Sequence, residues 1–304
     1  MALAHLNGVQ QGAREAARNP SAAAPRCLYA VNPATVPQRS PFRYPGGKTW
    51  FIPFVRQWLR SISCPGLQIV EPFAGGAIVG LTAAFESLVS RVTLVELDPN
   101  VAAVWMTILN GGGSRLAERY ASFEPNAESV HAVLSAIPHS TEERAFHTLL
   151  RNRTSRGGIM APGSGLIKRG ENGKGLSSRW YPETIRRRIL DIVGLRDRIG
   201  FIQGDGLAVM KAQSSNPSIA WFIDPPYTVA GKRLYAYSEV DHAELFRIAG
   251  GLAGDFVITY DASPEIESLA EGSGFQSRRV MMKTTHHDQK YELIIGRNLE
   301  WLDT

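Results

Sequence analysis

The chain has 304 residues, 44% of them hydrophobic, and a formal net charge of +5 at pH 7. This length suits one large α/β domain, or a core domain that carries an insertion. No apolar run approaches the roughly 20 residues of a membrane span. The two cysteines, Cys27 and Cys64, are too few for a disulfide framework and match no zinc-ligand spacing. We therefore expect a cytoplasmic protein without a structural metal, and the positive charge favours a polyanionic partner.

The first 39 residues are rich in Ala, Pro, Asn and Gln and have no clear apolar period. They also lack a basic segment followed by an unbroken apolar stretch, so they do not resemble a signal peptide. We predict that residues 1–39 form a mobile tail.

The stretch FRYPGGKTWF contains Gly47-Lys48-Thr49, which resembles the end of a phosphate-binding P-loop. A P-loop also needs a glycine five residues before Gly47, where Phe42 stands, and a buried strand before it. Three prolines in the preceding ten residues rule out a central strand there. We therefore reject the triphosphatase interpretation and predict a Gly-Gly turn, followed by a helix with one apolar face in TWFIPFVRQWL.

An alternation of strands and helices follows. LQIVEPF and RVTLVEL predict short buried strands, and each precedes a helical segment, LTAAFESL and PNVAAVWMTIL, with Pro99 at the start of the second. This pattern indicates a parallel sheet with helices on both faces. The strands RIGFIQGD, IAWFIDPPY and DFVITYDA come later, with the helix DHAELFRIAGGL between the last two, and SRRVMMKT with YELIIGRN predicts a terminal hairpin.

Between residues 111 and 198 the pattern changes to helices and irregular chain. We predict a catalytic domain of residues 40–110 and 199–304, interrupted by this mainly helical inserted region. From Arg151 to Arg188 there are ten Lys and Arg residues against two acids, with Trp180-Tyr181 near the end. Taken alone, the segment is either a solvated flexible loop or a surface that follows nucleic-acid phosphates.

A glycine-rich turn joins the first of these strands to its helix. The segment VEPFAGGAIVG places Gly75, Gly76 and Gly80 where the chain turns tightly, and Glu96 ends the next strand. A carboxylate there is positioned to accept hydrogen bonds from ribose hydroxyls. The pattern indicates an adenosine-type cofactor site. An ordinary turn stays possible, and so does a nicotinamide oxidoreductase, because Gly75-x-Ala77-x-x-Gly80 is one substitution from a dinucleotide fingerprint.

The segment WFIDPPY is the most informative one. The strand delivers Asp224 to the carboxyl edge of the sheet, and Pro225 and Pro226 have no N–H groups to occupy nearby acceptors. The Asp224 carboxylate and the Pro225 carbonyl thus suit a planar substrate with an NH₂ group, stacked on Tyr227. Because both amino hydrogens are accepted, the nitrogen is pushed toward a tetrahedral form that attacks an electrophilic methyl group. A rigid turn that only caps a strand is the structural alternative.

In these motifs the chain resembles the Dam-like adenine-specific DNA methyltransferases. The resemblance covers about residues 42–298, in the family's order, and includes RYPGGK, VEPFAGGA, VELDPN, LLRNRTSRGG, GDG, DPPY and YELII. It implies a Rossmann-like S-adenosylmethionine-dependent methyltransferase sheet and an inserted target-recognition subdomain. It also implies duplex DNA as the partner, with the target base flipped out. A prokaryotic or phage-encoded enzyme is expected, with a cognate restriction endonuclease as a possible further partner.

The resemblance also implies roles for individual residues. Asp224, Pro225, Pro226 and Tyr227 would hold the target base, Glu96 would bind ribose hydroxyls, and Asp205 would lie at the cofactor's adenine. The rest of the cofactor site would be formed by Tyr44, Lys48, Phe73, Gly75 and Gly76. The candidate DNA contacts are Arg151, Arg153, Arg156, Lys168, Arg169 and Arg179.

Two departures from the family leave alternatives open. Ala77 stands where the family has its last glycine of the cofactor turn, and the insertion lacks the fuller Tyr-Asn and Phe-Asn-x-Pro pattern. A methyltransferase acting on RNA or on protein amides, and a non-catalytic DNA-binding relative, remain competitors. The pair His286-His287 is assigned to a loop and not to a metal site, and His242 to a helix start capped by Asp241.

Overall fold

Eight strands form one sheet at the centre of the molecule, in the order β1-β7-β8-β6-β5-β2-β3-β4. The computed structural model describes residues 28–29, 35–44, 46–161, 163–170, 173–227, 239–283 and 289–303. The strands are β1 (Leu28–Tyr29), β2 (Gln68–Glu71), β3 (Arg91–Glu96), β4 (Ile199–Gln203), β5 (Ile219–Ile223), β6 (Phe256–Asp261), β7 (Gln276–Lys283) and β8 (Gln289–Gly296).

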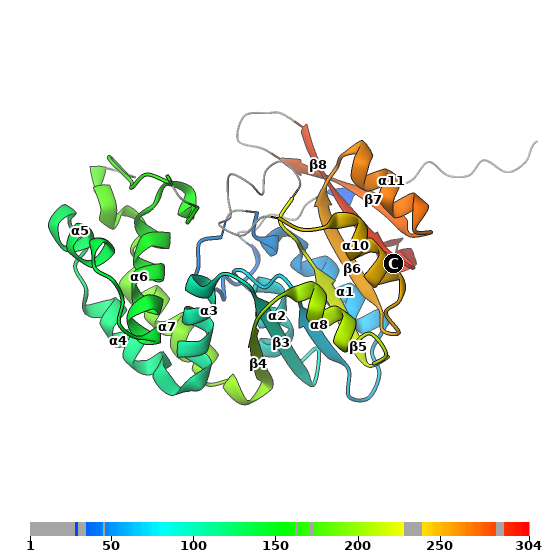
Figure 1. Ribbon diagram of the computed structural model, residues 1–304, viewed down its shortest axis with the longest axis horizontal. Coiled ribbons are helices and arrows are strands. Elements are labelled where there is room, and N and C mark those ends of the chain that lie inside the picture. The colour runs from blue at the N-terminus through cyan, green and yellow to red at the C-terminus, as the bar shows by residue number, and fades with distance from the viewer. Residues whose placement is uncertain are drawn as a thin grey trace, which may run out of the picture.

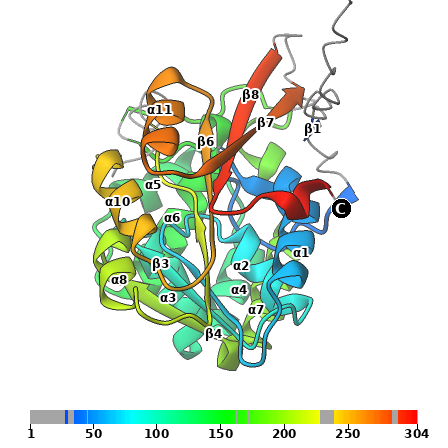
Figure 2. The same cartoon turned by 90° about the vertical axis from the view of Figure 1, so that its right-hand side faces the viewer.

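The strand directions create one functional edge. Strands β2 to β6 are parallel to their neighbours in this set, whereas β8 runs antiparallel to both β6 and β7. The carboxyl ends of β2 to β6 therefore lie along the same edge, where open α/β sheets bind ligands. The predicted α/β class and the predicted terminal hairpin, visible as β7 and β8 in Figure 2, are both confirmed.

Helices cover both faces of the sheet, and α8 and α10 lie on one side of the strands with α1 on the other (Figure 2). Successive residues of β2 divide between two apolar cores, because Ile69 faces one layer and Val70 the other. The first layer contains α1 (Ile52–Ser61), α2 (Ile78–Phe85) and α3 (Pro99–Thr107), and the second contains α8 (Gly206–Ala212), α10 (His242–Gly250) and α11 (Pro264–Gly272). Each fully buried large apolar side chain contributes about 1.5–3 kcal/mol.

The predicted helix after the Gly-Gly turn is confirmed. It begins with a 3₁₀ turn, η2 (Lys48–Phe51), and continues as α1, with Phe51, Val55 and Trp58 buried. The indole N–H of Trp58 donates to Asp255 at 3.0 Å. Helix α1 is thus fixed both by its apolar face and by one buried polar contact.

The predicted insertion contains a separate group of helices, drawn beside the sheet in Figure 1. Helix α6 packs against α3 of the sheet layer, and α4 packs against α7. The elements are η3 (Ile108–Gly112), α4 (Gly113–Ser122), α5 (Ala127–Ser135), α6 (Thr141–Thr154), η4 (Arg156–Gly158), η6 (Gly175–Arg179), α7 (Pro182–Val193) and η7 (Arg196–Arg198). The final element of the chain is η8 (Glu300–Asp303). No described helix is both long and apolar enough to cross a membrane.

The described part of the predicted tail is packed against the rest of the molecule. Strand β1 pairs in parallel with β7, and Val36 is buried in the first core. The Arg39 guanidinium lies 4.5 Å from the Phe85 ring centroid and forms a 3.0 Å ion pair with Glu86. The described residues of this segment are therefore packed, whereas the sequence predicted a mobile tail up to residue 39. Residues 1–27 and 30–34 lie outside the described residues.

Candidate active site

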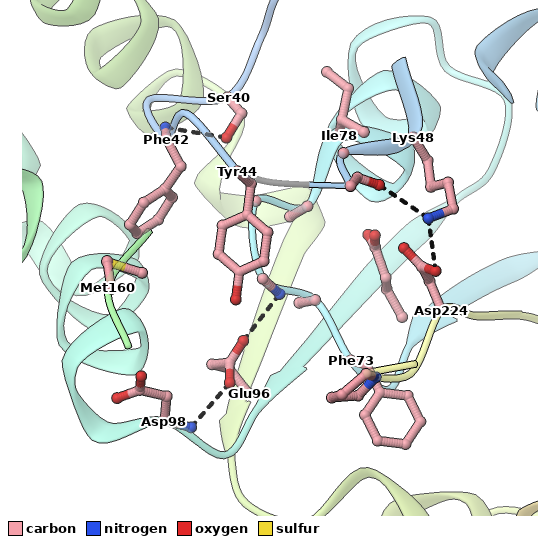
Figure 3. A pocket seen from close by; sticks show the side chains of 18 of the residues that line it. Ser40, Phe42, Tyr44, Lys48, Phe73, Ile78, Glu96, Asp98, Met160 and Asp224 are labelled. Carbon is pink, nitrogen blue, oxygen red and sulfur yellow. Dashed lines mark hydrogen bonds and ion pairs between the residues drawn. The ribbon is translucent and has the colours of Figure 1, made fainter. Parts of the chain in front are cut away.

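A cavity of about 640 Å³ lies at the carboxyl edge of the sheet. This volume is within the usual range for sites that bind small molecules and cofactors. The wall combines the ends of β2, β3 and β5 with residues of the amino-terminal turn and of the insertion (Figure 3). The residues predicted to bind a cofactor all line it: Tyr44, Lys48, Phe73, Gly75, Gly76, Glu96 and Asp205.

The glycine turn after β2 is shaped by the Tyr44 ring. Gly75 has a φ of 47°, in the left-handed region that favours glycine. A Cβ atom at Gly75 would lie only 2.7 Å from Cε1 of Tyr44. Glycine is therefore favoured here by the tight turn, as the sequence predicts, and also by the Tyr44 ring. The indole N–H of Trp105, on α3, donates to the Gly75 carbonyl at 3.0 Å and holds the turn in place.

Ala77, the departure from the family pattern, is itself in the left-handed conformation. Its φ is 52° and its ψ is 31°, at the N-cap position of α2. The turn is therefore formed without a glycine here, at a steric cost of about 1–2 kcal/mol. This conformation explains on steric grounds why glycine is favoured at this position.

Glu96 lies at the end of β3 and is anchored by the backbone. One carboxylate oxygen accepts the Gly75 N–H and the other accepts the Asp98 N–H, both at 2.9 Å. Burial raises the pKa of Glu96 to about 7, although these N–H groups oppose the shift. Asp98 caps α3, ahead of Pro99 at its first position as predicted, and Asp205 caps α8. Each anchored carboxylate keeps lone pairs that can accept from ligand hydroxyls.

A buried ion pair joins the amino-terminal turn to the end of β5. Lys48 Nζ lies 2.8 Å from Asp224 Oδ1 and donates to the Gly46 carbonyl at 2.9 Å (Figure 3). Burial alone lowers the pKa of the Lys48 ammonium, but the carboxylates of Asp224 and Glu292 outweigh it and raise the pKa above its ordinary value. Lys48 is therefore held as a cation, directly beside the carboxylate of Asp224, the predicted catalytic aspartate.

Two further side chains complete this arrangement. The Thr259 hydroxyl donates to the same Asp224 Oδ1 at 2.8 Å, and the Tyr227 hydroxyl donates to Glu292 at 3.2 Å. Lys48 Nζ lies 3.8 Å from Glu292 and 5.0 Å from the Tyr227 ring centroid. Asp224 and Pro226 line the cavity, whereas Tyr227 packs next to Lys48. The aspartate and the tyrosine of the motif are thus both tied to one lysine.

Glu71, Thr259 and Glu292 were missed by the sequence reasoning. Glu71 is only 4% exposed at the end of β2, and one of its oxygens accepts the Gly80 N–H at 2.9 Å. Burial raises the pKa of Glu71 to about 8, and the charge of Asp224 adds to the shift. A carboxylate inside an otherwise apolar strand, as in LQIVE and YELII, is the signal that indicates such a residue.

The candidate DNA contacts differ in their surroundings. Arg156, Lys168 and Arg169 are exposed, and Arg151 and Arg179 are half-buried, as a binding surface requires. Arg153 does not fit this prediction, because it is 5% exposed and its Nε donates to the Pro41 carbonyl at 3.2 Å. Burial lowers its pKa to about 10. Arg153 therefore fixes the segment before the Gly-Gly turn and does not reach an external phosphate in this conformation.

Of the histidines set aside in the sequence, the structure describes His242. His242 begins α10 as predicted, with Asp241 as the N-cap, and its ring lies 2.7 Å from the Tyr260 hydroxyl. His286, His287 and Asp288 lie outside the described residues. Within the described ranges, no three His, Cys, Asp or Glu side chains gather as metal ligands do.

Comparison with known proteins gives likeness in fold only. No protein-family model matches the chain, and no curated protein matches it in sequence. Similar solved structures include the B. subtilis tRNA methyltransferase TrmK, 11% identical with a TM-score of 0.35, over 81% of this chain and 64% of that one. The rRNA methyltransferase aviRa from Streptomyces viridochromogenes is 14% identical with a TM-score of 0.36, over 84% of this chain and 86% of that one. A geranyl diphosphate methyltransferase, solved with sinefungin, is 11% identical with a TM-score of 0.35, over 90% and 87%.

This chain thus spans less than two thirds of the length of TrmK. Likenesses this distant carry no argument about the substrate.

Proposed function

We propose that the chain is a site-specific DNA adenine methyltransferase, which transfers a methyl group from S-adenosylmethionine to the amino nitrogen of a flipped-out adenine. One observation carries the proposal: Asp224 and Pro226, which follow β5, line the same cavity as the glycine turn and Glu96. An acceptor for an amino group and a site for an adenosine cofactor thus share one space.

The residues of the cavity fit the cofactor chemically. Glu96 and Asp205 both line the cavity, and their carboxylates can accept hydrogen bonds from ribose hydroxyls and from an adenine amino group, respectively. The carboxylates of Asp224 and Glu292 flank the Lys48 ammonium, so this end of the cavity suits a cationic sulfonium better than a phosphate. When bound, S-adenosylmethionine supplies an electrophilic methyl group.

Asp224 has one oxygen occupied and one left for the substrate. Lys48 and Thr259 both contact Oδ1, at 2.8 Å each, so we assign the role of substrate acceptor to Oδ2. Oδ2 accepts one hydrogen of the adenine amino group, and the Pro225 carbonyl accepts the other. The nitrogen lone pair is thereby withdrawn from the ring and made available for bond formation. Tyr227 supplies the stacking face, and its hydroxyl bond to Glu292 fixes the ring.

A nucleic acid is the favoured acceptor because of the charges on the insertion, and the resemblance of the motifs to adenine-specific DNA methyltransferases favours DNA. Lys and Arg outnumber acids ten to two between Arg151 and Arg188, and Arg156, Lys168 and Arg169 are exposed there. Such a surface binds phosphates without regard to sequence, and base contacts add specificity. A flipped base costs a few kcal/mol of lost stacking, which Tyr227 partly restores.

Expression in cells that lack adenine methylation, followed by modification-sensitive sequencing of their DNA, tests the proposal. We expect methylated adenines in one short sequence for the wild type and none for Asp224→Ala. Asp197→Ala, which removes a carboxylate that is 97% exposed, is the matched control and should keep full methylation. Methylation by Asp224→Ala would contradict the assigned role.

Incorporation of labelled methyl groups by the purified protein separates the alternatives. DNA should be labelled, whereas RNA and protein should not. Labelling of RNA alone would show that RNA, and not DNA, is the substrate. Binding of DNA without binding of the cofactor would indicate a non-catalytic relative. A cognate restriction endonuclease would cleave the same sequence only when it is unmethylated.

A further inference from the structure

Tyr181 combines an unusual backbone with an exposed aromatic ring. It precedes α7 with a φ of 43° and a ψ of 61°, a left-handed conformation that costs a bulky residue stability. Its side chain is 46% exposed, and only Leu97 and Ile137 are comparable exposed large apolar side chains among the described residues. A strained position that displays an aromatic ring to solvent calls for a functional explanation.

The residues on both sides of Tyr181 hold it in place. Trp180 is 3% exposed and stacks on Tyr120 with 3.9 Å between ring centroids, and its carbonyl accepts the Tyr120 hydroxyl at 2.6 Å. Pro182 is the first residue of α7, and the Tyr181 carbonyl accepts the Ile185 N–H at 3.1 Å. The exposure of Tyr181 therefore does not result from a frayed helix end, because these contacts hold the backbone on both sides of the residue.

The charges around Tyr181 differ from those elsewhere in the cavity. The insertion contributes Arg153, Arg179 and Arg188 to the described wall, together with Tyr181 and no acid. The acids of the wall all belong to the predicted catalytic domain: Glu71, Glu96, Asp98, Asp205, Asp224, Glu239 and Asp241. The acids of the cavity thus lie on the side of the predicted catalytic domain, where Arg43 and Lys48 also stand, and the insertion side has arginines without acids. Arg153 is already bonded to the Pro41 carbonyl, so Arg179, beside the Tyr181 ring, is the candidate for an anion contact.

An aromatic ring beside arginines favours a nucleic acid over other anions. The Arg179 guanidinium donates to the Tyr181 hydroxyl at 3.4 Å, so cation and ring share one surface. Every nucleobase has a face that stacks on such a ring, while the neighbouring phosphates pair with arginine. A small anion such as phosphate would use the arginines and leave the ring without a role.

We infer that Tyr181 stacks on a nucleobase of the nucleic-acid substrate, next to a phosphate contact made by Arg179. This inference rests on the proposed function and adds to it a base contact outside the acceptor position. Because the backbone that carries the ring is already fixed in the free protein, little backbone ordering is required on binding.

Binding measurements on the full chain test the inference. The probes are a labelled mixed-sequence single-stranded DNA, whose base faces are open to stacking, and inorganic polyphosphate, which has the charges but no bases. We expect Tyr181→Ala to weaken DNA binding about tenfold, to leave polyphosphate binding unchanged and to keep the salt dependence. Tyr181→Gly, which accepts the left-handed backbone, should behave alike, whereas Tyr181→Phe should bind normally. Arg179→Gln should weaken both probes and reduce the salt slope by about one.

The outcomes separate this inference from the proposed function. Unchanged DNA binding in both Tyr181→Ala and Tyr181→Gly would overturn it, and so would equal losses on DNA and polyphosphate. Ile137→Ala removes a side chain that is 80% exposed and should change neither probe. Absence of methylation with every acceptor would refute the proposed function while these binding losses stayed measurable. Normal methylation with unaffected binding by Tyr181→Ala would refute this inference alone.

Discussion

Glu71→Gln should change how the stability of the protein depends on pH. Burial raises the pKa of Glu71 from 4.5 to about 8, so the folded state binds this proton more tightly than the unfolded chain. The stabilisation is complete below about pH 4.5 and is lost as the pH rises through about 8. Each pH unit in this window corresponds to about 1.36 kcal/mol, so the full loss is about 5 kcal/mol.

Glutamine has the shape of the protonated carboxyl group and can still accept the Gly80 N–H, but it does not titrate. Urea unfolding of both proteins from about pH 6 to about pH 9 measures the effect. The wild type should lose about 2.7 kcal/mol more than Glu71→Gln over this interval. Glu96, whose pKa is raised to about 7, titrates in both proteins. Its contribution to the pH dependence therefore cancels in the difference between the two stability curves. Parallel stability curves would refute the conclusion that Glu71 is held protonated.

Three further substitutions probe the turn, the ion pair and the insertion. Ala77→Gly should raise the free energy of unfolding by about 0.5–1 kcal/mol, because the left-handed strain exceeds the entropy cost of glycine, and a lower urea midpoint would contradict this. Lys48→Met leaves Asp224 without its cation and should cost about 3–5 kcal/mol, much of it restored by adding Asp224→Asn; additive losses in the double variant would argue against the pair. Tyr120→Phe leaves the buried Trp180 carbonyl unpaired and should cost about 1–3 kcal/mol, so an unchanged midpoint would show that this bond contributes little.

Local sequence patterns predicted most of the fold because its strands are short and apolar and are bounded by glycine or proline. The helix start at Pro99 and the hairpin of β7 and β8 were predicted for the same reason. The order of strands in the sheet is set by long-range packing, and no local pattern determines it.

The site was predicted where one segment carries the chemistry, as around Asp224. It was not predicted where partners come from separate segments, such as Thr259 on β6 and Glu292 on β8. Neighbouring residues also diverge, because Trp180 is buried and Tyr181 exposed although both are aromatic. Composition describes the basic segment as a whole and does not tell which of its side chains faces the core.

The ion pair of Lys48 also bears on the order in which this end of the cavity can form during synthesis. Its cation lies on η2, Asp224 follows β5, and Glu292 lies on β8. A nascent chain that has emerged only as far as β6 already contains Lys48, Asp224 and Thr259, but not the carboxylate that holds the Tyr227 hydroxyl. The Tyr227 ring is therefore secured only after β8 has left the ribosome and paired with β6.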